Sequence, residues 1–219
     1  SISLNYPSYL LDTQYRMHND IMTFSNVYFY KGKLQTALEI QSKTQNQTFK
    51  AVIFIDTAGT GFEEQMPEET SKDMYLSKYN EGEYFILREH LLRLISEHLE
   101  LKEKNIVVIT PYRAQVRYIN DRIQEDETLY NLNIRVSSID GYQGQESDIV
   151  IISLVRSNVK GEIGFLKDYR RMNVAMTRAK LHLAIIGDSA TLSGDKFYST
   201  LIDHVNDAGQ YHSAYEYMY

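Results

Sequence analysis

The sequence predicts an α/β domain built as a three-layer sandwich around a mostly parallel central sheet. Short, continuous apolar runs rich in β-branched residues recur along the chain, and such runs are typical of strands buried on both faces. Segments with helical spacing of apolar residues separate most of these runs, as the crossovers between parallel strands require. The 219 residues are 43% hydrophobic and 24% charged, which fits a folded domain of ordinary composition. We therefore expect a single domain over residues 1–219, with loop insertions at 39–50 and 61–80 and a C-terminal tail at 206–219.

A helix is predicted first, followed by a polar loop and a buried strand. The helix begins at Asn19 or Asp20, either of which can cap it, and runs to about Phe29. Residues 39–50 are polar and are predicted to form a loop. Residues 51–56 (AVIFID) are apolar and partly β-branched, which indicates a buried strand.

An acidic loop, a long helix and a second strand follow. Residues 62–73 carry five acidic side chains, so we expect a solvated loop there. Residues 81–101 place apolar side chains close to helical spacing between charges, which predicts a helix. Residues 105–112 (NIVVITPY) repeat the pattern of a buried strand, and residues 114–124 are again helical.

The C-terminal half continues the alternation of strands and helices. Residues 134–139 form a predicted strand, and residues 149–155 (IVIISLV) form the most apolar strand of the chain. A helix is predicted at 170–180, a strand at 181–186 and a final helix at 197–205. Functional side chains of parallel sheets gather at the carboxyl ends of the strands. Here those ends carry Asp56, Thr110, Pro111, Tyr112, Ser138, Ile139, Asp140, Arg156, Gly187 and Asp188.

Composition and missing motifs exclude several classes of site. The chain has no cysteine, which excludes disulfides, a thiol nucleophile and cysteine-based metal sites, and the histidine spacing predicts no metal site. The net charge of −6 provides no global positive field for nucleic acid. No apolar run reaches the roughly 18 residues of a membrane-spanning helix, so no membrane partner is expected. No Gly-x-x-x-x-Gly-Lys-Ser/Thr loop is present, so ATP cannot be bound through that loop by these residues.

Two segments carry arginine or carboxylate groups that suit a nucleotide, and each alone also has a simpler explanation. Arg171 and Arg178 are seven residues apart, so on the predicted helix they share one face about 10 Å apart and could bind phosphate. Surface arginines paired with acidic neighbours are the simpler reading. In residues 136–148, hydroxyls and two glycines allow close approach of a ligand, and Glu146 could accept hydrogen bonds from a sugar. A tight connection between two strands explains the same residues.

Two further segments are suggestive but equally weak in isolation. In residues 14–16, an aromatic side chain beside a cation could stack on a base while the cation reaches a phosphate. Residues 110–115 leave a strand and enter a helix, whose free N–H groups could bind phosphate. A proline-marked turn between strand and helix accounts for that segment without any ligand.

In this order, the four segments together resemble the motifs of one family. Residues 11–18 (LDTQYRMH) look like helicase motif IV, and residues 110–115 (TPYRAQ) look like the Thr-Pro-Tyr-x-x-Gln element. Residues 138–146 (SIDGYQGQE) look like motif V, and residues 171–180 (RMNVAMTRAK) look like motif VI. The chain thus resembles the second RecA-like domain of superfamily 1 DNA/RNA helicases, in the branch of the nonsense-mediated-decay and immunoglobulin-switch-region-binding helicases. Asn19 departs from the pattern, because the family usually has proline there.

The resemblance implies a role for ten residues. Arg16 and Arg178 would be catalytic and would reach the γ-phosphate of ATP across a cleft between two domains. The other nucleotide-binding residues would be Tyr15 near the adenine, Gly144 at the point of close approach, Glu146 on the ribose, and Arg171. The nucleic-acid track would include Thr110, Tyr112, Gln115 and Ser138.

The resemblance also implies what the rest of the protein contains. The phosphate loop, Walker B and motif III belong to a first RecA-like domain, which we expect before Ser1 and which would hold the Mg²⁺ that accompanies ATP. The partners would be that domain and single-stranded DNA or RNA, with movement from 5′ to 3′. The isolated chain is expected to be inactive. The tail composition and the 61–80 insertion most resemble bacterial members of the family, which favours a cytoplasmic location. A non-catalytic nucleic-acid- or protein-binding module and a free-standing nucleotide-binding protein are the alternatives.

Overall fold

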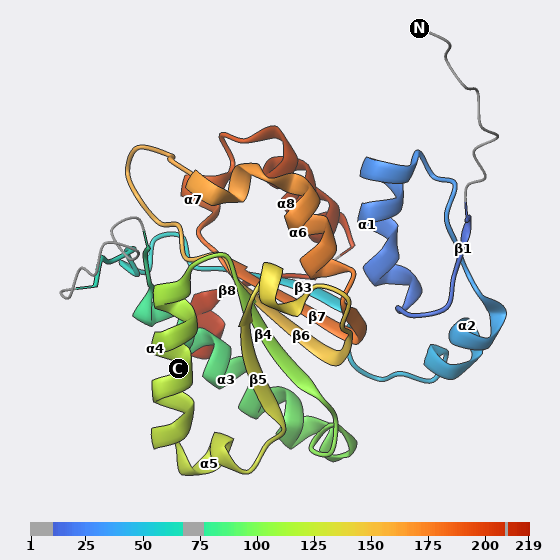
Figure 1. The fold of residues 1–219 in the computed structure, drawn as a ribbon, viewed down its shortest axis with the longest axis horizontal. Coiled ribbons are helices and arrows are strands. Elements are labelled where there is room, and N and C mark those ends of the chain that lie inside the picture. The colour runs from blue at the N-terminus through green and yellow to red at the C-terminus, as the bar shows by residue number, and fades with distance from the viewer. Residues whose placement is uncertain (1–10, 68–76, 209) are drawn as a thin grey trace, which may run out of the picture.

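A six-stranded parallel sheet forms the centre of the protein in a computed structural model that describes residues 11–67, 77–208 and 210–219 (Figure 1). The strand order is β5-β4-β6-β7-β3-β8, and all five neighbouring pairs are parallel. The strands are β3 (Val52–Asp56), β4 (Ile106–Thr110), β5 (Ile134–Ser138), β6 (Ser147–Ser153), β7 (Ala179–Gly187) and β8 (Tyr211–Ser213). The predicted α/β class with a mostly parallel sheet is therefore confirmed.

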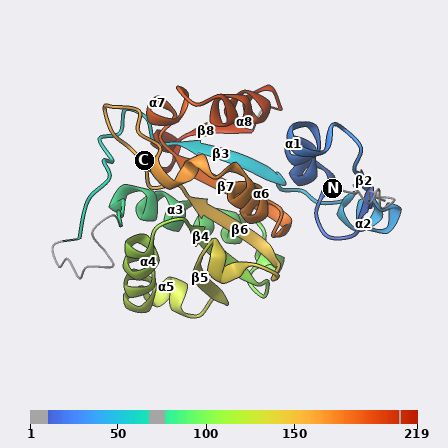
Figure 2. The same cartoon turned by 45° about the horizontal axis from the view of Figure 1, so that its top comes forward.

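Helices cover both faces of this sheet, which makes the three layers. Figure 2 shows α8 on one side of the sheet and α3 and α4 on the other. The first face carries α1 (Asn19–Tyr30), α6 (Tyr169–Met176) and α8 (Lys196–Asp207). The second carries α3 (Glu81–Glu97), α4 (Arg113–Glu125) and α5 (Glu127–Tyr130). Successive residues of β6 alternate between the two cores: Val150 packs in the first and Ile151 in the second. Because both faces are buried, the inner strands β3, β4 and β6 are mostly apolar rather than alternating, whereas the edge strands β5 and β8 are only partly buried.

The N-terminal segment differs from its prediction in two places. The cap of α1 is His18, whose ring Nδ1 accepts from the backbone N–H of Asp20 at 3.1 Å, so neither Asn19 nor Asp20 is the cap. Within the predicted 39–50 loop, helix α2 (Leu38–Thr44) forms instead. Only Ile40 and Thr44 of α2 are buried, which is too little apolar periodicity for a sequence pattern to show. A two-stranded parallel sheet, β1 (Thr13–Gln14) with β2 (Gln35–Thr36), flanks this segment.

Two predicted helices end early. Helix α3 stops at Glu97, and a short 3-10 turn at Leu99–Leu101 replaces its predicted last turn. Helix α6 stops at Met176, because Ala179 already pairs with Ser147 as the first residue of β7. Arg178 therefore lies outside the helix, and the expectation that it shares a helix face with Arg171 is wrong.

The tail, and Glu64 in the described part of the 61–80 insertion, pack more closely than the sequence suggests. The tail contributes β8, which pairs with β3 through Phe54 and Tyr211, and a 3-10 turn at Ala214–Tyr217 that packs on the second core. The prediction of a solvated loop is wrong for Glu64, whose side chain is 9% exposed. Residues 68–76 of the insertion lie outside the described residues. Within the described part of the chain, no helix has both the length and the apolarity to cross a bilayer.

Candidate functional site

Four charged side chains meet at the amino ends of β6 and β7. Glu146 directly precedes β6, and its carboxylate contacts Arg16 Nε at 2.7 Å and Lys180 Nζ at 2.8 Å. Arg178 directly precedes β7, where its backbone carbonyl accepts from Ser147 N–H at 3.0 Å. The structure thus brings together the predicted residues Arg16, Glu146 and Arg178. They gather at the amino ends of the strands. Functional side chains were predicted at the carboxyl ends, which lie on the opposite edge of the sheet.

A tight turn between β1 and α1 places Arg16. The Gln14 side-chain oxygen accepts from the backbone N–H groups of Arg16 at 2.8 Å and Met17 at 2.9 Å, and its amide nitrogen donates to Met17 O at 2.8 Å. The His18 N–H then donates to Lys180 O at 2.8 Å, which joins the turn to β7. Gln14 and His18 are therefore positioning residues for Arg16, and both lie in the 11–18 segment that resembles motif IV.

Two backbone carbonyls hold Arg178, one at the end of α6 and one in the loop before β6. Its Nε donates to Val174 O at 2.9 Å, and its Nη1 donates to Gln145 O at 3.1 Å. A cation is favourable at a helix carboxyl end, where carbonyl groups lack partners. Burial lowers the pKa of Arg178, and the nearby positive charge of Arg16 lowers it further. The two guanidinium groups are close enough to repel one another, and a bound anion would relieve that repulsion.

Glu146 is an ionised, partly exposed acceptor at this site. Hydrogen bonds from Lys180 and then Arg16 hold the pKa of its carboxyl below the usual value. Lys180 had no predicted role, although it ends the segment that resembles motif VI. The neighbouring Gly144 has a φ of +80°, and no heavy atom lies within 4 Å of the position its Cβ would take. Tyr15 is 65% exposed, so the aromatic ring, the glycine and the carboxylate are all accessible.

Arg171 lies at the other end of α6. Its guanidinium pairs with Asp140 at 3.3 Å and with Asp168 at 3.4 Å. Asp168 also caps α6 by accepting from the Arg171 N–H at 3.2 Å. Arg171 and Arg178 are thus at opposite ends of one short helix, and the structure does not bring Arg171 to the Glu146 cluster.

The residues predicted along a nucleic-acid track lie at the carboxyl end of the sheet. Thr110, Tyr112 and Gln115 are 0%, 2% and 0% exposed, respectively. Gln115 is fully engaged: its side chain accepts from the Asn80 N–H and donates to Asn80 O and Ser153 Oγ. These three side chains therefore serve the interior in this structure. Ser138 alone among the four keeps a partly exposed side chain.

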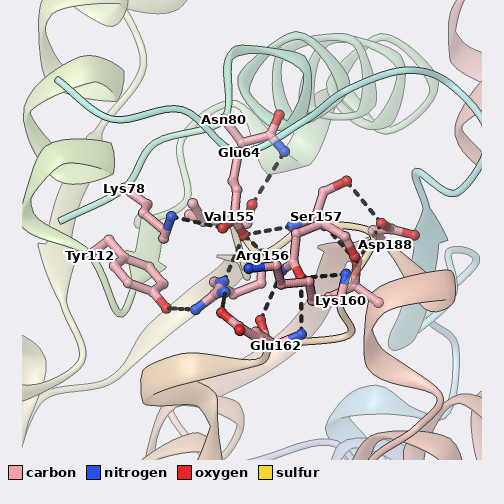
Figure 3. A network of polar contacts seen from close by, with 12 residues as sticks. Glu64, Lys78, Asn80, Tyr112, Val155, Arg156, Ser157, Lys160, Glu162 and Asp188 are labelled. Carbon is pink, nitrogen blue, oxygen red and sulfur yellow. Dashed lines mark hydrogen bonds and ion pairs between the residues drawn. The ribbon is translucent and has the colours of Figure 1, made fainter. Parts of the chain in front are cut away.

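A largely buried polar network surrounds the residues that follow the carboxyl end of β6 (Figure 3). The Glu64 carboxylate contacts Lys78 Nζ at 2.8 Å and Arg156 Nε at 2.7 Å, and it accepts from Ser157 N–H at 3.1 Å and Asn158 Nδ2 at 3.2 Å. Burial raises the pKa of Glu64, but hydrogen bonds from Lys78, Arg156 and Asn158 outweigh it and hold the pKa below the usual value. Sequence reasoning noted Arg156 as a strand end and missed Glu64, which looked like one of several solvated acids.

Glu83 in the first turn of α3 is a second carboxyl that sequence reasoning missed. It is fully buried and lies 2.6 Å from Ser153 Oγ, and it accepts from the Val155 N–H at 2.8 and 2.9 Å. Burial raises the pKa of Glu83 to about 8. Val155 has a φ of +71°, a costly conformation for a β-branched residue, so Glu83 holds a strained turn just before Arg156.

Comparison with known proteins gives one consistent likeness. A family model described as an AAA domain matches residues 2–190. DNA polymerase alpha-associated DNA helicase A of Saccharomyces cerevisiae is 39% identical over 203 residues, which cover 85% of this chain and 29% of that protein. Mouse DNA-binding protein SMUBP-2 is 34% identical, with 95% of this chain and 21% of that protein covered. The chain thus spans less than a third of these relatives.

A solved structure shares the fold. The crystal structure of the C-terminal domain of a possible DNA helicase from Lactobacillus plantarum superposes with a TM-score of 0.51 and 13% identity. The superposition covers 92% of this chain and 99% of the other. At that identity the likeness concerns the fold alone.

Proposed function

We propose that this chain, which belongs to the AAA domain family, is the second motor domain of an ATP-dependent superfamily 1 helicase or translocase. In this proposal it completes an ATP site together with a first RecA-like domain of the same protein. The observation that carries the proposal is the gathering of Arg16, Arg178 and Lys180 around the single carboxylate of Glu146. Three cations against one acid make a local excess of positive charge in a chain of net charge −6.

The two arginines are the proposed catalytic residues. A guanidinium fork matches the oxygens of a phosphate, and neither fork is committed to a buried acid. Arg178 now bonds to two carbonyls, and Arg16 bonds to Glu146 and to the carbonyl of Thr177. Closure of the two domains on ATP would bring both guanidinium groups to the γ-phosphate, where such an arginine is typically worth about 10³–10⁵ in rate.

The surrounding residues suit the rest of the nucleotide. The exposed ring of Tyr15 can stack on adenine, and the Glu146 carboxylate can accept from ribose hydroxyls. The open space at Gly144 lets the backbone approach the ligand. Because Arg171 is paired with Asp140 at the far end of α6, we now assign it to positioning the 139–146 loop.

ATP brings the transferable phosphoryl group and its Mg²⁺, and we assign the metal to the first domain. Among the described residues, no group of three or more acidic or histidine side chains could hold a metal ion. The strand of DNA or RNA is proposed to cross the carboxyl end of the sheet near Ser138, and the 5′-to-3′ direction rests on the resemblance alone. The 139–146 loop joins the carboxyl end of β5 to the amino end of β6. In this proposal it transmits the structural change on ATP hydrolysis to the bound strand of DNA or RNA.

ATP hydrolysis by the full-length protein and by this isolated chain tests the proposal. We expect turnover stimulated by a single-stranded oligonucleotide in the full-length protein and negligible turnover in the isolated chain. Robust hydrolysis by the isolated chain would contradict a shared site. Oligonucleotide binding without hydrolysis by the full-length protein would instead favour a non-catalytic binding module.

A further inference from the structure

Phe165 is an exposed aromatic residue between two buried residues of the largely exposed loop that joins β6 to α6. It lies in the 3-10 turn Gly164–Lys167, between β6 and α6, and the residue is 53% exposed. Its neighbours Ile163 and Leu166 are 3% and 1% exposed, so they fix the turn in the first core and leave the ring outside. A large apolar side chain presented by a fixed backbone is suited to binding.

The buried residues beneath the ring hold it in place. Gly164 has a φ of +56°, and a Cβ there would lie 2.1 Å from Arg156 Nη1 and 2.8 Å from the Tyr112 hydroxyl. The loop backbone therefore rests directly on these two side chains, which are themselves 3.4 Å apart. The Tyr112 ring lies 5.4 Å from the Phe165 ring at an interplanar angle of 45°.

Glu64 in turn holds Arg156 in place through an ion pair (Figure 3). The Glu64–Arg156 pair is buried, with side-chain exposures of 9% and 6%, and Glu64 also accepts from the backbone N–H of Ser157. A carboxylate with several donors and little solvent holds a guanidinium in one geometry. Contacts thus run from Glu64 through Arg156 and Tyr112 to the exposed ring of Phe165.

Three cationic side chains without ion pairs in the described part of the chain flank Phe165 in the sequence. Within the described residues, no ion pair engages Lys160, Lys167 or Arg170, and all three are exposed. The acids of the same segment are occupied: Glu162 faces Arg156 at 3.9 Å, and Asp168 pairs with Arg171 at 3.4 Å. A stacking surface between unpaired cations is the combination that binds single-stranded nucleic acids.

The loop that carries Phe165 also lies at the carboxyl end of the sheet, where the single-stranded DNA or RNA is proposed to bind. Strands β5, β4 and β6 are neighbours, and at their carboxyl ends lie Ser138, Tyr112 and the loop that carries Phe165. Phe165 therefore lies at the same end of the sheet as the partly exposed Ser138, two strands away from it.

We propose that Phe165 is a platform on which one base of a single-stranded DNA or RNA stacks, while Lys160, Lys167 and Arg170 contact the flanking phosphates. Glu64, Arg156 and Tyr112 are positioning residues that hold the platform. The inference rests on the proposed function, since it requires that the protein bind a single strand.

Affinity of the full-length protein for a fluorescein-labelled single-stranded oligonucleotide, measured by fluorescence anisotropy at constant salt, tests the platform. Stacking of a base on an aromatic ring is worth about 1–3 kcal/mol, so Phe165→Ala should weaken binding roughly 5- to 150-fold. Phe165→Trp should restore the affinity. Val159→Ala is the matched control, because Val159 is 100% exposed on the same loop but has no ring, and it should bind within about twofold of wild type.

A spectroscopic readout separates stacking from a structural effect. This chain contains no tryptophan, so Phe165→Trp reports on the platform when wild-type emission is subtracted. Its emission should be quenched by the oligonucleotide, and Glu64→Gln in the same background should reduce that quenching. Wild-type affinity in Phe165→Ala, or no quenching in Phe165→Trp, would overturn the inference alone. Failure of the wild-type protein to bind any single strand would overturn it together with the proposed function.

Discussion

Arg16 and Glu146, which are 130 residues apart in sequence, are joined by a hydrogen-bonded ion pair of 2.7 Å between Nε and Oε2. Their side chains are 33% and 43% exposed, so the pair contributes little to stability and can open at low cost. The pair therefore keeps the proposed catalytic arginine near the proposed ribose acceptor, and both side chains remain free to bind the nucleotide. Lys180, on the other carboxylate oxygen, keeps Glu146 in place when Arg16 leaves.

Arg178→Ala in the full-length protein should abolish most ATP hydrolysis and spare most nucleotide binding. The guanidinium is proposed to contact the γ-phosphate only in the closed state, so its loss should lower kcat by about 10³-fold or more. The measurement is steady-state hydrolysis with a saturating single-stranded oligonucleotide, alongside the affinity for a fluorescent ATP analogue. Arg117→Ala is the control, because Arg117 is an exposed arginine of α4 that pairs with Asp121 on the same helix, and its hydrolysis should stay close to wild type. Hydrolysis by Arg178→Ala within a few-fold of wild type would remove Arg178 from the catalytic site.

Gly164→Ala should destabilise the protein more than Gly144→Ala does. Both glycines have positive φ, which costs any other residue about 1–2 kcal/mol. A Cβ at Gly144 meets no heavy atom within 4 Å, whereas one at Gly164 would overlap the Arg156 guanidinium at 2.1 Å. The added displacement of a buried, ion-paired side chain should raise the cost by several kcal/mol. Urea midpoints of the two variants measure the difference, and equal midpoints would show that the loop moves off Arg156 freely.

The inner strands could be predicted from the sequence because burial on both faces of the sheet requires a continuous run of apolar residues. Val150 and Ile151 face different cores, so both odd and even positions of residues 149–152 are apolar. The end of α6 could not be predicted, because pairing of Ala179 with Ser147 overrides a local sequence that would continue as a helix. Tertiary contact decided that boundary, and with it the place of Arg178.

The composition of the candidate site was accessible only through resemblance. Nothing in the local sequence of Arg16 points to Glu146, and their proximity depends on how β1, β6 and β7 are arranged. Glu64 was beyond prediction for a similar reason: a single acid among several becomes buried only because Arg156, 92 residues later, faces it. Polar residues that gain partners over such separations carry no periodic signal that a sequence pattern could reveal.

His90 and His182 should make the protein sensitive to acid. The His182 Nδ1 lies 2.7 Å from the carbonyl of Lys50, so it donates there, and its Nε2 then accepts from the His90 Nε2 at 3.0 Å. Burial lowers the pKa of His182 to about 4 and that of His90 well below its usual value. The native state therefore binds fewer protons than the unfolded chain, and stability should be lost as pH falls from about 6.5 towards 4. His90→Gln should flatten this acid slope in urea unfolding, whereas His204→Gln on α8 should not; equal slopes in both variants would show that the pair does not govern it.

Glu83→Gln should remove an opposite, alkaline dependence. The pKa of Glu83 is about 8 in the native state against 4.5 without burial, so the native state holds an extra proton between these values. Stability should therefore be fully present below about pH 4.5, fall by up to about 1.4 kcal/mol per pH unit as pH rises, and level off above about 8. Glutamine keeps an acceptor for the Val155 N–H and cannot ionise, so the variant should lose the slope between pH 5 and 8. Glu81→Gln, in the same first turn of α3 but exposed, is the control for urea midpoints measured at pH 5 to 9. A slope in Glu83→Gln as steep as in wild type would mean that Glu83 is ionised in the native protein, and that the strained turn at Val155 is held by a carboxylate.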